Sequence, residues 1–177
     1  MPHDPAADVR PNRTLGLLVV AHAINHAQAV LLPLVFLAVI DEFGISPATI
    51  AFLAAAGAFA SGIVQIGFGA LARFVSRRLI LGVGGIVFGA GFAGQAAAPG
   101  FASFAAVNVV SRIGGAPQHP VGNGLLAEQF APHRRGFAIS AHIAGGNVGT
   151  VVVALCSPPG PLRTNSWSAM PSSWQVS

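Results

Sequence analysis

Residues 48–85 read ATIAFLAAAGAFASGIVQIGFGALARFVSRRLILGVGG, two apolar runs separated by a short basic segment. The first run, 48–72, carries no charged residue. About 20 apolar residues suffice to cross the hydrocarbon core of a bilayer. Arg73, Arg77 and Arg78 follow before the second run starts at Leu79. The stretch therefore predicts two transmembrane helices joined by a basic turn.

The composition of the whole chain agrees with a membrane protein. Hydrophobic residues make up 53% of the 177 residues and charged residues only 8%, whereas soluble domains carry about 25% charged residues. We therefore expect the lipid bilayer to be the solvent and a partner of the chain. The net charge of +4 comes from arginine, and most of the arginines lie in short segments before or between apolar runs. Nucleic-acid binders instead cluster basic residues on an exposed face, so we expect no nucleic-acid partner.

The apolar runs predict an all-α membrane protein with about five transmembrane helices. Pro33 lies in the first of them, and Pro117 and Pro120 are expected to bend the fourth. Proline is tolerated in membrane helices where neighbouring groups satisfy the freed carbonyl. The expected transmembrane region is 14–155, with helices over about 14–40, 48–72, 79–98, 101–127 and 136–155.

Charges in the loops predict the orientation of the helices. Basic residues gather in cytoplasmic loops of membrane proteins. The loops 41–47 and 97–100 hold no arginine, whereas the tail 1–13 and the other two loops hold seven. We therefore expect a cytoplasmic N-terminal tail and a multi-pass protein in the cell membrane, the bacterial inner membrane. The seven arginines are Arg10, Arg13, Arg73, Arg77, Arg78, Arg134 and Arg135.

The segment 156–177 differs from the rest of the chain. It is rich in Ser and Pro, holds Trp167 and Trp174, and contains the one cysteine, Cys156. A single cysteine excludes an internal disulfide. We expect a tail that is not native-looking, produced by a frameshift or truncation near Leu155.

Several polar side chains fall at membrane depth, where such groups commonly face a cavity or a partner. His22, His119 and His142 each lie roughly 10 Å inside the expected cytoplasmic boundary, at a rise of about 1.5 Å per residue. One interpretation is a shared cavity that serves as a substrate or proton pathway. The alternative is that each residue makes one interhelical hydrogen bond. The candidates are His22, Asn25, His26, Gln118, His119, His142 and Asn147.

Arg112 is the most costly of these candidates because it carries a permanent charge near the middle of the fourth expected helix. No Asp or Glu lies inside any of the five expected spans. A bound anion or additional helices must therefore supply its partner. We expect a role in substrate binding or gating, with snorkelling to the interface as the alternative.

Other patterns indicate packing or exclude chemistry. The GxxxG spacing from Gly145 to Gly149 favours close helix packing. The chain has no nucleophile elbow, no phosphate loop and no metal-spaced Cys/His set. We therefore expect no enzyme activity, no cofactor and no metal.

The basic turn resembles the loop motif between the second and third helices of the major facilitator superfamily. Gly69, Arg77 and Arg78 match that motif, and Arg73 stands where the motif has an acid. HAINHAQAVLLPLVFLAVIDEFGIS, GAPQHPVGNGLLAEQF and RRGFAISAHIAGGNVG are similar to the fosmidomycin-resistance-like branch. Arg112 with the following Gly114 and Gly115 resembles the fourth-helix arginine motif of proton-coupled drug antiporters.

The resemblance covers 14–155 and implies the N-terminal part of a secondary transporter, one with two six-helix halves around a central site. It implies proton-coupled efflux of small molecules or drugs by the complete protein and no transport by this chain alone. Two alternatives remain. Histidines at positions 22, 26, 119 and 142 could ligate haem in a redox subunit, or the chain could be a non-functional remnant.

Overall fold

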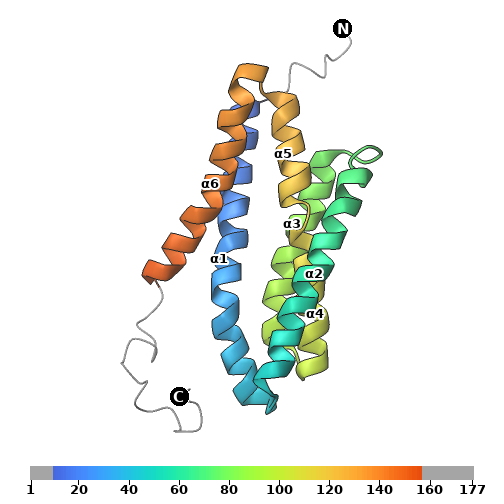
Figure 1. Ribbon diagram of the computed structural model, residues 1–177, viewed down its shortest axis with the longest axis vertical. Helices are drawn as coiled ribbons and strands as arrows, with labels where there is room; N and C mark the ends of the chain where they lie inside the picture. The colour runs from blue at the N-terminus through green and yellow to red at the C-terminus, as the bar shows by residue number, and fades with distance from the viewer. Residues whose placement is uncertain (1–9, 157–177) are drawn as a thin grey trace, which may run out of the picture.

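The computed structural model describes residues 10–156, which are helical almost throughout (Figure 1). The predictions for residues 1–9 and for the tail after Cys156 lie outside the described residues. The elements are α1 (Pro11–Phe43), α2 (Pro47–Leu71), α3 (Arg77–Gly94), the 3₁₀ turn η2 (Gln95–Ala97), α4 (Phe101–Gly115), α5 (Gln118–Gln129) and α6 (Pro132–Cys156).

Local sequence signals set the ends of the helices. α1 ends at Gly44, whose φ of 60° lies in the left-handed region that glycine adopts without strain. The hydroxyl of Ser46 accepts a hydrogen bond from the backbone N–H of Thr49 at 3.2 Å and caps α2. Ser76 caps α3 in the same way through the N–H of Leu79. Both caps satisfy N–H groups that a helix start leaves free.

The fourth expected helix, 101–127, is divided into α4 and α5 by a turn at Ala116 and Pro117. Proline has no N–H to donate, and its ring clashes with the carbonyl four residues earlier. The N–H of Ala116 bonds to the carbonyl of Ile113 at 3.2 Å, which tightens the last turn of α4. The bend expected at Pro117 is therefore a full interruption, whereas α1 continues through Pro33.

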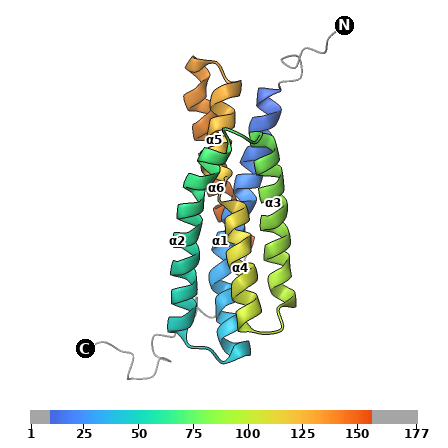
Figure 2. The ribbon, with the colours of Figure 1, turned by 90° about the vertical axis from the view of Figure 1, so that its right-hand side faces the viewer.

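Glycines allow the helices to approach closely. α6 packs along α1, and a Cβ placed on Gly145 would lie 2.9 Å from the carbonyl oxygen of Val19. α4 packs against α3, where a Cβ on Gly114 would lie 2.6 Å from the backbone nitrogen of Phe88. Figure 2 shows α4 between α2 and α3, with α1 behind it. The GxxxG spacing in α6 thus serves packing against α1, as expected.

Two apolar clusters lie toward the two ends of this bundle. One joins α1, α2 and α4 through Phe36, Leu53 and Phe104, among others. The other joins α1, α5 and α6 around Leu18 and Leu126. The buried polar residues are separate from both clusters, and they are His22, Gln95, Asn108, Ser111 and His142.

Large apolar side chains also cover the outside of the bundle. Phe52, Phe59 and Ile66 of α2 are each more than 70% exposed. Contiguous exposed apolar surface marks contact with a membrane or another protein. α1, α2, α6 and the segment 77–97 are long and apolar enough to cross a membrane. The chain is therefore a multi-pass membrane protein.

The helix connections segregate the charges to opposite ends. The start of α1, the α2–α3 connection and the α5–α6 connection lie at one end of the bundle in Figure 1. These segments, together with the first turns of α1, α3 and α6, carry every arginine of residues 10–156 except Arg112. The α1–α2 connection lies at the other end, next to Asp41 and Glu42. The bundle therefore has one basic end and one acidic end.

Candidate functional site

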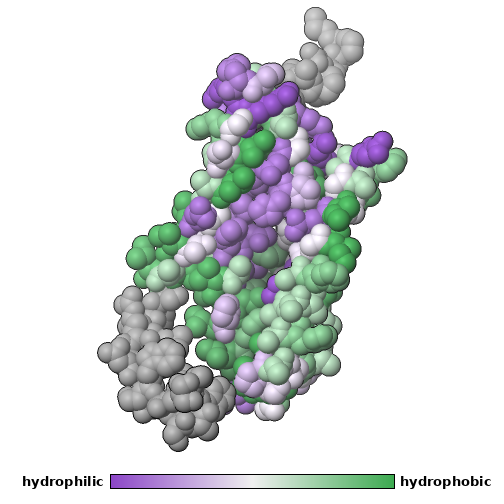
Figure 3. Space-filling model, in the orientation of Figure 1, coloured by the Kyte–Doolittle hydropathy of each residue, from purple (hydrophilic) through white to green (hydrophobic). Residues whose placement is uncertain are grey.

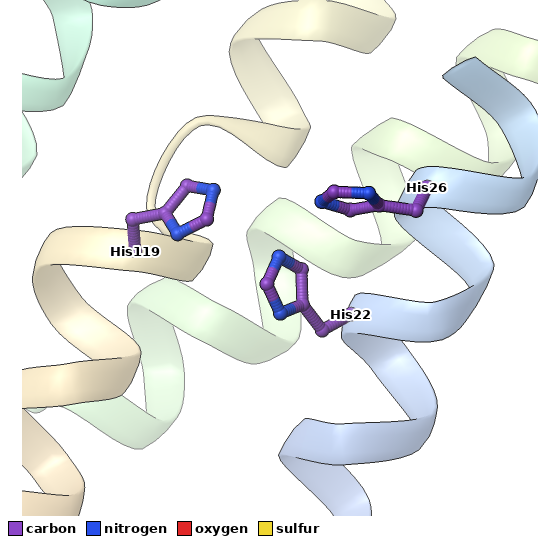
Figure 4. Close-up of side chains that lie close together, drawn as sticks. All are labelled: His22, His26 and His119. Atoms are coloured by element: carbon purple, nitrogen blue, oxygen red, sulfur yellow. The ribbon is translucent and has the colours of Figure 1, made fainter. Parts of the chain in front are cut away.

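Three histidines, one from each of three helices, gather around His22. Its ring centroid lies 4.7 Å from that of His26 on α1, 4.8 Å from that of His119 on α5 and 4.6 Å from that of His142 on α6. Figure 4 shows His22, His26 and His119 directed toward one another. The similar depths estimated for His22, His119 and His142 thus correspond to a real convergence of their helices.

One hydrogen bond orients His22. Its Nδ1 lies 2.8 Å from the carbonyl oxygen of His142. A carbonyl only accepts, so Nδ1–H donates and the other nitrogen, Nε2, carries the lone pair. Nε2 of His22 is buried and has no protein partner in the described structure, and the same holds for both ring nitrogens of His142. The cluster therefore presents lone pairs that no protein donor satisfies.

Arg112 anchors a second polar network beside the histidines. Its Nε donates to Oδ1 of Asn108 at 3.0 Å, and Nδ2 of Asn108 donates to Oε1 of Gln95 at 3.1 Å. α2 passes close to this side chain because residue 57 is glycine: a Cβ there would lie 2.8 Å from Cδ of Arg112. The amide groups and the glycine position the guanidinium, and no other side-chain hydrogen bond of Arg112 is found among residues 10–156.

The guanidinium lies at the wall of a cavity of about 220 Å³. Phe88 and Phe92 of α3 contribute apolar surface to the cavity, and polar side chains contribute the rest of its charged and hydrogen-bonding lining. Figure 3 shows hydrophilic residues gathered in the upper middle of one face, bordered by hydrophobic surface. The polar and charged side chains that line the cavity are Asn25, Gln28, Ser61, Gln65, Gln95, Asn108, Ser111, Arg112 and His119.

The charge of Arg112 has no carboxylate partner in the part of the chain that the structure describes. The acidic residues of that part, Asp41, Glu42 and Glu128, lie at helix ends. The ion pair found among residues 10–156 joins Arg77 at the start of α3 to Glu128 near the end of α5. The cavity is therefore positive, and an acceptor for the other N–H groups must come from water, a ligand or additional chain.

The loop motif lies apart from this cavity, at the basic end of the bundle. Gly69, Arg73 and Arg78 are exposed. A Cβ on Gly69 would meet nothing within 4 Å, so the packing does not require glycine there. Arg77 is the residue of the motif that links two helices, through Glu128.

The structure does not bring all the predicted site residues together. Asn25, Arg112 and His119 line the cavity, and His22, His26 and His142 lie in the adjoining cluster. Gln118 lines an adjoining, largely apolar pocket that shares Asn25, Gln28 and Phe88 with the cavity. Asn147 is exposed on α6.

Sequence reasoning missed the partners of Arg112. Asn108 lies four residues before Arg112, a spacing that places two side chains on one helix face, and this signal was available. Gln95 lies near the end of the third expected helix, where no sequence pattern distinguished it. Its contact with Asn108 depends on how α3 and α4 pack together. No Cys/His spacing in the sequence predicted a metal site. The fold nevertheless brings imidazole nitrogens of three histidines within 4.8 Å of one another.

Comparison with known proteins gives one match. The Major Facilitator Superfamily profile matches residues 18–168. No curated protein and no solved structure matches the chain significantly. The match includes every described helix from Leu18 onward, and therefore both the cavity and the histidine cluster.

Proposed function

Because the chain belongs to the major facilitator superfamily, we propose that it forms part of a secondary transporter for small amphipathic anions, with the Arg112 cavity as the substrate site. The superfamily comprises transporters, so the chain is not an enzyme. Membership also implies a lipid bilayer and a transported substrate. The nature of that substrate is the subject of this proposal.

The observation that carries the proposal is a guanidinium without a carboxylate partner among the described residues, in a cavity that Phe88 and Phe92 also line. A charge at membrane depth is expensive unless a counter-charge, water or hydrogen bonds compensate it. Asn108 satisfies one N–H group of Arg112 and brings no negative charge. A carboxylate or phosphonate on the substrate matches the remaining forked donors, and Phe88 and Phe92 match an apolar or aromatic body.

The cavity is smaller than a typical ligand pocket, which measures about 300–1,000 Å³. In alternating-access transporters two repeats enclose the substrate site. We therefore propose that this chain supplies one wall of the site and does not transport alone. The same cavity and the adjoining histidines form the substrate or proton pathway of the complete transporter.

The coupling ion and the direction follow from the sequence resemblance. Arg112 with Gly114 and Gly115 resembles the arginine motif of proton-coupled antiporters, so we propose proton-coupled efflux. The basic end of the bundle is cytoplasmic by the charge rule, and the bacterial inner membrane is the proposed location. The loop residues Arg73, Arg77 and Arg78 then lie on the cytoplasmic side with the N-terminal tail.

The test is binding of a matched pair of probes to the purified full chain in detergent. Benzoate and benzamide have nearly the same shape and differ in charge. Isothermal titration calorimetry is expected to detect benzoate and to find benzamide at least about tenfold weaker, since a hydrogen bond to a charged group contributes about 1.5–3 kcal/mol. Arg112→Ala is expected to remove the preference for benzoate.

Arg134→Ala is the matched control, because Arg134 has the same charge and lies at the basic end, outside the cavity. It should bind benzoate as the unaltered chain does. Equal affinity for both probes, or a preference that survives Arg112→Ala, would contradict the proposal. Substrate flux into proteoliposomes that contain this chain alone would contradict the statement that it supplies only one wall.

The two alternatives fare differently. A haem site needs a planar slot between two axial ligands, whereas the histidine rings here pack against one another at 4.6–4.8 Å. The family match also places the chain among transporters. The remnant hypothesis stays open to experiment, and detection of stable chain in membranes at ordinary levels would argue against it.

A further inference from the structure

We propose that His22, His26 and His119 form a binding site for one divalent transition-metal ion, of the kind represented by Zn²⁺. The site joins α1 to α5 beside the Arg112 cavity. These histidines also belong to the pathway proposed above, but the test of the metal site is separate, because metal binding is measured on the chain itself and requires neither an anionic substrate nor flux.

Geometry is the first argument. One nitrogen from each of the three rings lies within 4.8 Å of the other two. Nitrogen ligands about 2.0–2.1 Å from a tetrahedral zinc ion lie about 3.4 Å from one another. His119 is exposed and His26 is half-buried, so the proposal requires their side chains to rotate and bring the nitrogens closer when the ion binds. Figure 4 shows the three rings around one common space.

The orientation of His22 is the second argument. Metal-binding histidines usually donate their second ring N–H to a carbonyl or carboxylate, which fixes the tautomer and directs the other nitrogen to the metal. His22 has this arrangement: Nδ1 donates to the carbonyl of His142, and Nε2 is buried without a partner. An unsatisfied buried acceptor costs about 1–3 kcal/mol. A cation at the common space supplies what Nε2 lacks.

Glycines on the neighbouring helices make room for the rings. A Cβ on Gly146 of α6 would lie 2.8 Å from Nε2 of His26. A Cβ on Gly122 of α5 would lie 3.3 Å from Nε2 of His142. Any larger residue at these positions would push into the imidazoles. The backbone is therefore shaped around the ring cluster.

The ligand set selects the class of metal. Imidazole nitrogen suits zinc, nickel, cobalt and copper, whereas calcium and magnesium require oxygen ligands. Of the described acidic residues, Asp41, Glu42 and Glu128 all lie at helix ends and do not belong to the cluster. Three protein ligands leave one tetrahedral position open. That position faces the cavity, because His119 lines it.

The experiment is a titration of the purified full chain with ZnCl₂, measured by isothermal titration calorimetry. We expect one ion per chain. We also expect the absorption bands of tetrahedral Co²⁺ when CoCl₂ replaces ZnCl₂. His26→Ala and His119→Ala should each weaken Zn²⁺ binding by at least about tenfold, the lower end of what loss of an outer partner costs. Neither side chain is fully buried, so both variants should fold, which circular dichroism checks.

His133→Ala is the matched control. His133 lies at the start of α6, outside the cluster, and its loss should leave Zn²⁺ binding unchanged. The proposal is overturned if the chain binds no Zn²⁺, or if His26→Ala and His119→Ala bind it as tightly as the unaltered chain. It is equally overturned if His133→Ala removes binding, because the ion would then sit at the basic end.

Discussion

The packing of α3 against α4 makes a sharp prediction for Gly114→Ala. The added Cβ would lie 2.6 Å from the backbone nitrogen of Phe88, 2.8 Å from the carbonyl oxygen of Gly84 and 3.0 Å from the carbonyl carbon of Val87. Ordinary contacts begin at 3.4 Å, so the closest approach is about 0.8 Å too short. All three neighbours are backbone atoms and cannot rotate away. The two helices must separate.

Overpacking of this kind costs about 1–3 kcal/mol, a substantial part of a typical stability of about 5–15 kcal/mol. Gly89→Ala on α3 is the control, because a Cβ there meets nothing within 4 Å. Removing glycine from an open helix position should stabilise by about 0.5–1 kcal/mol. The two substitutions add the same methyl group and should shift stability in opposite directions.

Unfolding by increasing amounts of sodium dodecyl sulfate in a mild detergent, followed by far-ultraviolet circular dichroism, measures both variants. Gly114→Ala should unfold at a lower fraction of sodium dodecyl sulfate than the unaltered chain. Gly89→Ala should unfold at the same or a higher fraction. The reasoning is refuted if Gly114→Ala is as stable as Gly89→Ala, because α3 and α4 would then not be in backbone contact.

Two more predictions concern the ends of the bundle. The side chains of the Arg77–Glu128 pair are 29% and 56% accessible, so the pair is partly exposed. A double-mutant cycle of Arg77→Gln and Glu128→Gln should therefore give a coupling free energy of about 0.2–1 kcal/mol that falls with salt. A larger coupling that does not depend on salt would show that the pair is buried in the membrane-embedded protein. Cys156 is exposed at the end of α6, away from the basic helix connections, so a membrane-impermeant maleimide should label it from outside intact spheroplasts and not in inside-out vesicles. The reverse labelling pattern would invert the proposed orientation.

The helices could be predicted from the sequence because each apolar run is long and the bilayer sets its length. The interruption at Pro117 was only partly foreseen. A proline predicts a bend, but whether neighbours restore the helix depends on packing, and here α1 continues through Pro33 while α4 ends before Pro117. The local sequence contributes to the difference, because Gly114 and Gly115 come shortly before Pro117, whereas leucines precede Pro33.

The site could be predicted where the depth of a residue in the membrane is enough to place it. His22, His119 and His142 were matched by their distance from the helix ends, and the structure brings their rings together. Depth says nothing about which side of a helix faces inward, so Asn147 was grouped with His142 although it is exposed. The role of Asn108 beside Arg112 was within reach of the spacing rule.

The central claim is that Arg112 makes the cavity selective for anions, and thiol accessibility tests it most directly. In a Cys156→Ser background, Gln65→Cys places a thiol on the cavity wall, and Ile66→Cys places one on the outer face of α2, where Ile66 is 78% exposed. Two thiosulfonate reagents, one with a sulfonate and one with a trimethylammonium group, are compared after normalisation to a free thiol in solution.

The measurement is the ratio of the two modification rates at residue 65, with and without Arg112→Gln. The account predicts that the anionic reagent reacts faster at residue 65, that Arg112→Gln abolishes this preference, and that residue 66 shows no dependence on Arg112. Faster reaction of the cationic reagent at residue 65, or an anion preference unchanged by Arg112→Gln, would contradict it.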